Sequence, residues 1–150
     1  MKDKQKWVKR AFHGYWADKA RLPKLRDELA NIDIPGCGSG DPSKPFTSGS
    51  AGNGVEKSVL QYLAEKERIS LAIKDCENRI ALVDKTLEHF SVEELAKGRK
   101  QGKYIRCRFL RGMSYTRAAI ECEISESTAG YWLTEIMTVA YAIAEMEGYI

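Results

Sequence analysis

The strongest chemical signal in this sequence is a run of positive charge between residues 97 and 117. It holds eight basic residues and no acidic one: Lys97, Arg99, Lys100, Lys103, Arg106, Arg108, Arg111 and Arg117. A solvated protein face usually mixes both signs, and this segment does not. We therefore expect it to bind a polyanion, with a merely solvated face as the alternative.

The residues that follow have the pattern of two short helices joined by a tight turn. Gly112 can end one helix in a left-handed conformation, and Ser114 can cap the next one. A turn at Cys122-Glu123-Ile124 then leads to Ser125, which can cap a further helix. Two short helices at this spacing predict a helix-turn-helix that presents its second helix to DNA.

The candidate DNA contacts divide into two groups. The base-facing candidates lie on the second helix: Glu126, Ser127, Thr128, Tyr131 and Thr134. The phosphate candidates lie before it or in its partner helix: Lys103, Arg106, Arg108, Arg111, Ser114 and Arg117. Because residues 118–150 contain no Lys or Arg, bases would be read through polar and methyl contacts. Tyr131 and Trp132 could instead be core or dimer aromatics.

The segment from Gly112-Met113-Ser114-Tyr115 to Ile124-Ser125-Glu126-Ser127-Thr128 resembles the promoter-reading C-terminal domain of sigma factors. The longer layout is a basic aromatic start, a Gly/Ser-rich linker, a long helix and then this motif. That layout is similar to the RinA/ArpU-like phage transcriptional regulators. The resemblance implies a sigma-like activator of phage late or packaging genes, with double-stranded DNA and host RNA polymerase as partners.

The motif departs from the sigma pattern at several positions. Glu123 stands where the turn often has Gly, and Ala129 stands where a larger aliphatic residue is common. Gly130 and Tyr131 occupy outer positions where Lys, Arg or Ser is usual. Gly130 inside a helix costs roughly 1 kcal/mol relative to Ala, so it either permits a close approach of DNA or is simply tolerated.

Residues 55–90 show a coiled-coil pattern. Apolar side chains recur at alternating spacings of four and three, and Lys66 alone interrupts them: Val55, Val59, Tyr62, Ile69, Ile73, Cys76, Ile80, Val83, Leu87 and Phe90. This periodicity predicts one long amphipathic helix. Its seam needs a partner, which is either the helices of residues 1–32 or a second copy of the chain in a homo-oligomer.

The N-terminal residues 1–34 predict amphipathic helices, with a break near Arg21–Leu22 because Pro23 suits the first turn of a helix. The aromatic residues between the lysines of this region can bind nucleic acid, but we favour packing of the rings against another helix. Residues 35–54 are predicted to be a flexible linker, because thirteen of these twenty residues are Gly, Pro or Ser.

Ser91 and Glu94 form a potential capping box, so the last domain is expected to begin at residue 91. The predicted fold class is all-α, with a long coiled-coil-type helix followed by a sigma-like helix-turn-helix domain. The expected segments are 1–34 for the N-terminal helices, 35–54 for the linker, 55–90 for the long helix and 91–150 for the DNA-binding domain.

Other function classes find little support in the sequence. The four cysteines are scattered and His13 and His89 stand apart, so we expect no metal site and no cofactor. No catalytic constellation is recognisable, and we do not expect an enzyme. No apolar run is long enough to cross a membrane, which favours a soluble protein in the cytoplasm of a bacterial host cell. Two alternatives remain: a small terminase-type DNA-packaging subunit, and a protein-binding adaptor with a degenerate helix-turn-helix.

Overall fold

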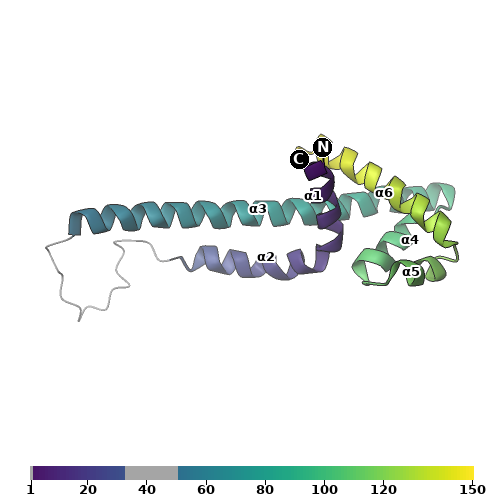
Figure 1. Ribbon diagram of the computed structural model, residues 1–150, viewed down its shortest axis with the longest axis horizontal. Helices are drawn as coiled ribbons and strands as arrows, with labels where there is room; N and C mark the ends of the chain where they lie inside the picture. The colour runs from purple at the N-terminus through teal and green to yellow at the C-terminus, as the bar shows by residue number, and fades with distance from the viewer. Residues whose placement is uncertain (1, 33–50) are drawn as a thin grey trace. The chain divides into compact units, whose positions relative to one another are not determined.

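The computed structural model describes residues 2–32 and 51–150, and for residues 51–57 it describes the backbone alone. Every regular element in these ranges is helical, which confirms the all-α prediction (Figure 1). The elements are α1 (Lys2–His13), α2 (Tyr15–Ala30), α3 (Ala51–Lys97), α4 (Gln101–Ile105), a π-helical turn η1 (Arg106–Leu110), α5 (Tyr115–Glu121) and α6 (Glu126–Met146). None of them is both long enough and apolar enough to span a membrane.

The chain forms two compact units, which we treat separately. Unit 1 comprises residues 1–20 and 76–150, and unit 2 comprises residues 21–75. The predicted domain boundary between residues 90 and 91 is therefore displaced, since α1 and the second half of α3 belong to the same unit as α5 and α6. The physical reason is the shared core of unit 1, to which α1 and α3 both contribute buried side chains.

The long helix exists, but its ends differ from the prediction. It begins at Ala51 and continues through Ser91 to Lys97, so Ser91 does not start a new helix. The sequence from Ser91 to Lys97 contains no Gly or Pro, and the helix ends at Gly98, whose φ of 68° is left-handed. The last four residues of the predicted linker are therefore helical, and the remainder of it lies outside the described residues.

The apolar seam predicted on α3 is buried along the second part of the helix, whereas Val59 near its start is 38% exposed. Ile69, Cys76, Val83 and Phe90 are buried at intervals of seven, whereas Lys66 is exposed. Part of the seam is covered by the N-terminal helices, because Asp18 of α2 forms a buried ion pair with Arg79 of α3. Folding back of the N-terminal helices on α3, one of the two predicted partners, is thus observed.

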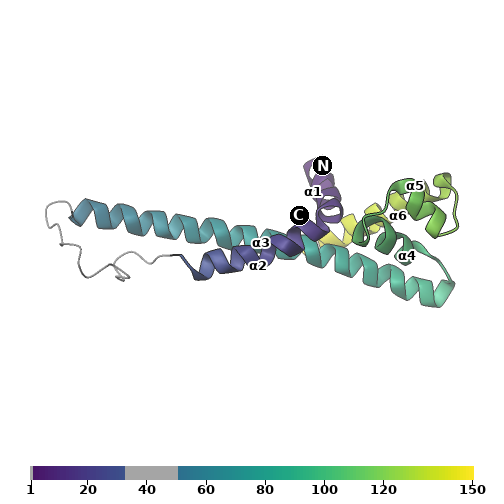
Figure 2. The same cartoon turned by 90° about the horizontal axis from the view of Figure 1, so that it is seen from below.

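The N-terminal break lies at Gly14 and not near Arg21–Leu22, so that prediction is wrong. α1 ends at His13, α2 starts at Tyr15, and Pro23 lies inside α2. Figure 2 shows α1 and α2 as separate helices. A Cβ atom at position 14 would come within 2.9 Å of the Arg10 carbonyl oxygen, which favours glycine there. α2 accommodates Pro23 in its interior, although a proline there removes one backbone hydrogen bond and its ring crowds the carbonyl four residues earlier.

The core of unit 1 explains why the aromatic residues of α1 and α2 pack. Phe12 and Tyr15 are buried, as we favoured, whereas Trp16 is 56% exposed. The Phe12 ring meets the Phe109 ring edge-on at 5.1 Å between centroids. α6 contributes mainly small side chains to this core: Ala129, Ala140 and Ala144, together with Ile136. Small residues let neighbouring helices approach closely, so α6 lies tightly against the rest of the unit.

Candidate nucleic-acid interface

Both predicted helix caps are present around α5 and α6. The Ser114 hydroxyl oxygen accepts a hydrogen bond from the Arg117 backbone N–H at 3.2 Å. The Ser125 hydroxyl oxygen accepts one from the Thr128 backbone N–H at 3.1 Å. Each cap satisfies an amide that would otherwise lack a partner at the helix start, so the serines fix where α5 and α6 begin.

The turn between α5 and α6 has a left-handed residue at its centre. Glu123 has a φ of 57°, the position at which sigma-type turns often carry Gly. The Ile124 backbone N–H donates to the Ala119 carbonyl oxygen at 3.0 Å, which closes the end of α5 as in a Schellman motif. A non-glycine residue in this conformation is strained by roughly 1–2 kcal/mol, so the turn forms despite its residue type.

Small residues bring α5 and α6 close together. Ala118, Ala119 and Ala129 are fully buried, which accounts for the small side chain at position 129. The Tyr115 hydroxyl donates to the Glu126 carbonyl oxygen, and a Cβ at position 130 would lie 3.1 Å from that hydroxyl. Gly130 is half-buried, and the atom that faces its missing side chain is the Tyr115 hydroxyl oxygen of the same chain.

The five base-facing candidates occupy different environments. Ser127 and Tyr131 are exposed, Tyr131 by 78%, and neither side chain has a hydrogen-bonding partner among the residues that the structure describes. The remaining three already have partners. The Glu126 carboxylate accepts from the Thr116 hydroxyl at 3.0 Å, Thr128 accepts from Ser125, and the Thr134 hydroxyl donates to the Gly130 carbonyl oxygen.

The phosphate candidates fall into two groups, those with partners within the protein and those without an ion pair. Arg106 forms an ion pair with Glu94 at 3.2 Å. Arg108 donates to the Met113 carbonyl oxygen at 3.1 Å, and its guanidinium lies over the Phe109 ring. Both arginines therefore help to hold the segment that precedes α5.

Lys103, Arg111 and Arg117 remain available. Arg111 and Arg117 are exposed and Lys103 is half-buried, and none of the three side chains forms an ion pair with a described residue. Ser114 is exposed as well, with its oxygen engaged in the cap. Three of the phosphate candidates thus remain uncompensated, in the same unit as the exposed residues of α6.

Sequence reasoning missed the acidic partners of the cationic segment. Arg99 pairs with Glu135 at 3.5 Å, and Lys100 pairs with Glu123 at 3.5 Å. The signal was present, because residues 118–150 carry six Glu and no basic residue. Two neighbouring segments of opposite charge and similar magnitude favour pairing in the folded chain.

The buried side chains between residues 97 and 122 are uncharged. Burial raises the pKa of the Tyr104 hydroxyl, and this hydroxyl has no hydrogen-bonding partner among the described residues. Burial also raises the pKa of the Cys122 thiol, which lies near Cys107. Both groups therefore stay protonated at neutral pH, and the charge of the region resides in its exposed lysines and arginines.

The region thus combines two capped helices, an exposed serine and tyrosine on α6, and three free cations. Among the described residues, no group of three His, Cys, Asp or Glu side chains is arranged to hold a metal ion. Comparisons of the chain with known protein families, with curated proteins and with solved structures find no match.

Proposed function

We propose that the protein is a sequence-specific DNA-binding transcriptional regulator in which α5 and α6 act as a helix-turn-helix. The observation that carries the proposal is the exposed start of α6, where Ser127 and Tyr131 face solvent in the same unit as Lys103, Arg111 and Arg117. The N-terminal residues of a recognition helix are the ones that reach base edges in the major groove.

The free cations and the free polar side chains suit different parts of a duplex. Lys103, Arg111 and Arg117 would contact phosphates, which supply affinity and fix the orientation of the protein. Ser127 and Tyr131 would contact base edges, since hydroxyl groups both donate and accept hydrogen bonds. α6 contains no Lys or Arg, so its own base contacts depend on these two residues.

The sigma-like motif and the layout of the chain extend the proposal. We infer that the regulator is of the RinA/ArpU-like type and activates late genes of a phage, in the cytoplasm of the bacterial host. Host RNA polymerase would be its protein partner in that role. The support is the resemblance of residues 112–128, together with the two serine caps that give this segment its shape.

The test begins with selection of binding sites from randomised duplex DNA by the full chain. Affinity for the selected duplex is then measured across a salt series for the wild type and for Arg111→Ala/Arg117→Ala. Two lost phosphate contacts should lower the slope of log K against log salt by roughly 2. The matched control is Lys24→Ala/Lys74→Ala, which removes the same charge from exposed positions in unit 2.

Specificity is tested on the same duplexes. Tyr131→Phe and Ser127→Ala should alter the selected sequence, since each good base contact contributes about 1–3 kcal/mol of discrimination. Failure to enrich any sequence, or a control variant as impaired as Arg111→Ala/Arg117→Ala, would contradict the proposal. Association with RNA polymerase by a chain without DNA affinity would favour the adaptor function instead.

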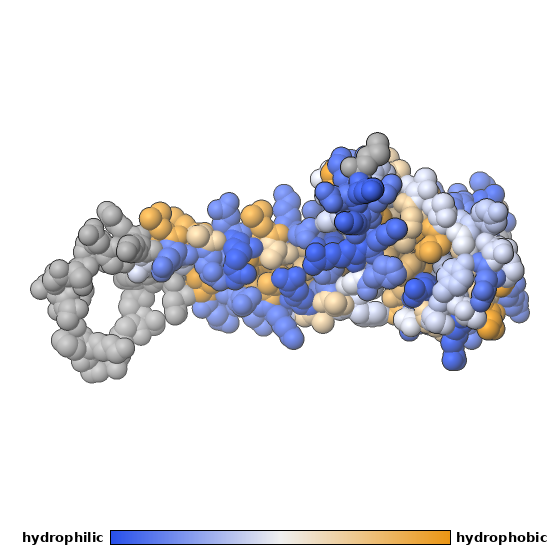
Figure 3. Space-filling model, in the orientation of Figure 1, coloured by the Kyte–Doolittle hydropathy of each residue, from blue (hydrophilic) through white to orange (hydrophobic). Residues whose placement is uncertain are grey.

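One observation favours a second candidate, a DNA-packaging subunit that assembles into a ring. In unit 2, α3 exposes Leu60, Leu63 and Leu71, by 66%, 52% and 59%. Figure 3 shows hydrophobic residues at the surface along this part of α3. Apolar side chains on a solvent-facing helix are a common means of self-association. The mass of the protein in solution discriminates, because a ring of many copies supports the packaging subunit and a monomer or dimer supports the regulator.

A further inference from the structure

We propose that α1 forms a second phosphate-binding edge, through Lys6 and Lys9, for DNA that lies along α6. This inference rests on the proposed DNA-binding function and extends it to a helix outside the helix-turn-helix. Its basis is a shared groove between α1 and α6, a surplus of positive charge on α1, and the complete lack of cations on α6.

α1 is held in place by its apolar side, which leaves its lysines free. Val8, Ala11 and Phe12 are buried in the core of unit 1, and the Trp7 ring lies 6.2 Å from the Tyr149 ring between centroids. The Trp7 and Phe12 rings of α1 are thus used for packing. The positive charges remain on the surface of a helix that is fixed against α6.

The charge on α1 is strongly one-sided. Its twelve residues include five cations and a single acid, Asp3. Lys6 and Lys9 are exposed, lie one helical turn apart, and form no ion pair with a described residue. Figure 3 shows hydrophilic residues gathered over α1, whereas the neighbouring surface over α6 is paler and more apolar.

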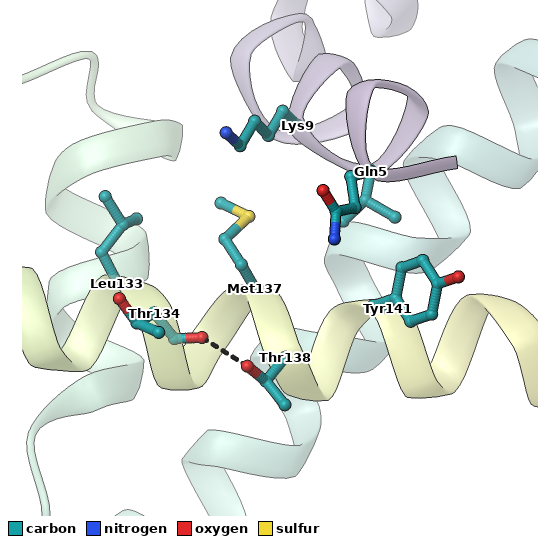
Figure 4. Close-up of a pocket in the computed structure, with 8 residues that line it drawn as sticks. Gln5, Lys9, Leu133, Thr134, Met137, Thr138 and Tyr141 are labelled. Atoms are coloured by element: carbon teal, nitrogen blue, oxygen red, sulfur yellow. Dashed lines mark hydrogen bonds between the residues drawn. The ribbon is translucent and has the colours of Figure 1, made fainter. Parts of the chain in front are cut away.

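The groove places Lys9 directly beside α6. Gln5, Val8 and Lys9 of α1 and Leu133, Thr134 and Thr138 of α6 are among the residues that line this groove, which has a volume of about 500 Å³. The Lys9 amine extends over the groove on the side of Leu133, that is, toward the start of α6 (Figure 4). A lysine in this position can reach a polyanion that rests on α6.

The exposed stripe of α6 leads to this groove. Ser127, Tyr131, Thr134 and Thr138 are exposed at spacings of four, three and four, so they follow one side of the helix. The hydroxyls of Thr134 and Thr138 donate to carbonyl oxygens of α6 itself, at 3.1 and 2.8 Å. This half of the stripe therefore offers small polar surface without charge, and Lys9 supplies the charge beside it.

The test compares two double variants on the selected duplex. Lys6→Ala/Lys9→Ala should lower the salt slope by roughly 2, because two phosphate contacts are lost. Lys4→Ala/Lys24→Ala removes the same charge, from the other side of α1 and from α2, and should leave the slope close to that of the wild type. All four lysines are exposed, and thermal unfolding of each variant checks that the fold is retained.

The outcomes separate this inference from the proposed function. If Arg111→Ala/Arg117→Ala weakens binding while Lys6→Ala/Lys9→Ala matches its control, the α1 edge is refuted and the helix-turn-helix stands. If the wild type binds no duplex, both proposals fall. If Lys6→Ala/Lys9→Ala retains full DNA affinity but loses RNA polymerase, the groove is a protein-docking site and the inference is overturned.

Discussion

The contact between α2 and α3 and the cationic segment of residues 97–117 use arginine in opposite ways. Arg79 is 2% exposed and makes two hydrogen bonds to the Asp18 carboxylate, at 2.7 and 2.8 Å. In the cationic segment, the ion pairs of Arg99, Lys100 and Arg106 are all partly open to solvent. Burial thus separates a charge that holds the fold from charges that stay accessible to a ligand.

This difference has energetic consequences. Removal of one partner from a buried pair leaves an uncompensated charge and typically costs about 3–5 kcal/mol. An exposed pair contributes about 0–1 kcal/mol because water and salt screen it. The exposed pairs of residues 97–117 can therefore exchange a carboxylate for a phosphate at little cost to stability, whereas Arg79 cannot leave Asp18.

The largest effect is expected when the buried ion pair between Arg79 and Asp18 is broken. Arg79→Ala should lower the free energy of unfolding by about 3–5 kcal/mol, since the Asp18 carboxylate then loses both hydrogen bonds. Arg99→Ala, which removes an exposed ion pair with Glu135, should cost less than about 1 kcal/mol. Denaturant unfolding of both variants measures the difference, and equal losses would refute the comparison.

A smaller effect is expected for a neutral buried group in the cationic segment. Tyr104 is fully buried, and its hydroxyl has no hydrogen-bonding partner among the described protein residues. Tyr104→Phe removes this hydroxyl and should raise the free energy of unfolding by about 1–3 kcal/mol. The reference is Tyr131→Phe, at an exposed hydroxyl, which should leave the midpoint of thermal unfolding unchanged; a destabilised Tyr104→Phe protein would show that the hydroxyl is satisfied.

The smallest effect is expected at the exposed ion pair between Glu123 and Lys100. Glu123→Gly removes the carboxylate that pairs with Lys100, but it also relieves the left-handed backbone at φ 57°. Because an exposed pair contributes little, the net result should be a gain of about 0.5–1 kcal/mol. Glu123→Ala, which loses the pair and keeps the strain, should be slightly destabilised. Thermal unfolding of the two variants checks the order.

The local features of the fold could be predicted from the sequence, because they depend on neighbouring residues. Ser114 and Ser125 cap helices, and Gly112 adopts a left-handed φ of 68°, as expected. The error at Ser91 has a physical cause. A serine can cap a helix or continue it, and α3 meets no Gly or Pro until Gly98, so it continues through Ser91.

The candidate site was less predictable, because its charges are settled by residues distant in the sequence. The partners Glu94 and Glu135 lie 12 and 36 positions from Arg106 and Arg99. Periodicity indicates which side of a helix is apolar, but it does not indicate which acid on another helix meets a given arginine. For the same reason, the groove that joins Lys9 to Thr134 and Thr138 could not be foreseen.

The π-helical turn η1 has a consequence for how this surface can be altered. The Arg111 backbone N–H donates to the Arg106 carbonyl oxygen, five residues back, so the turn contains one residue more than an α-helix requires. A deletion within Arg106–Leu110 could close as an ordinary α-helical turn and would rotate the following side chains by about 100°. Such a deletion would therefore re-aim Arg111, one of the cations that the proposed function assigns to phosphate contacts.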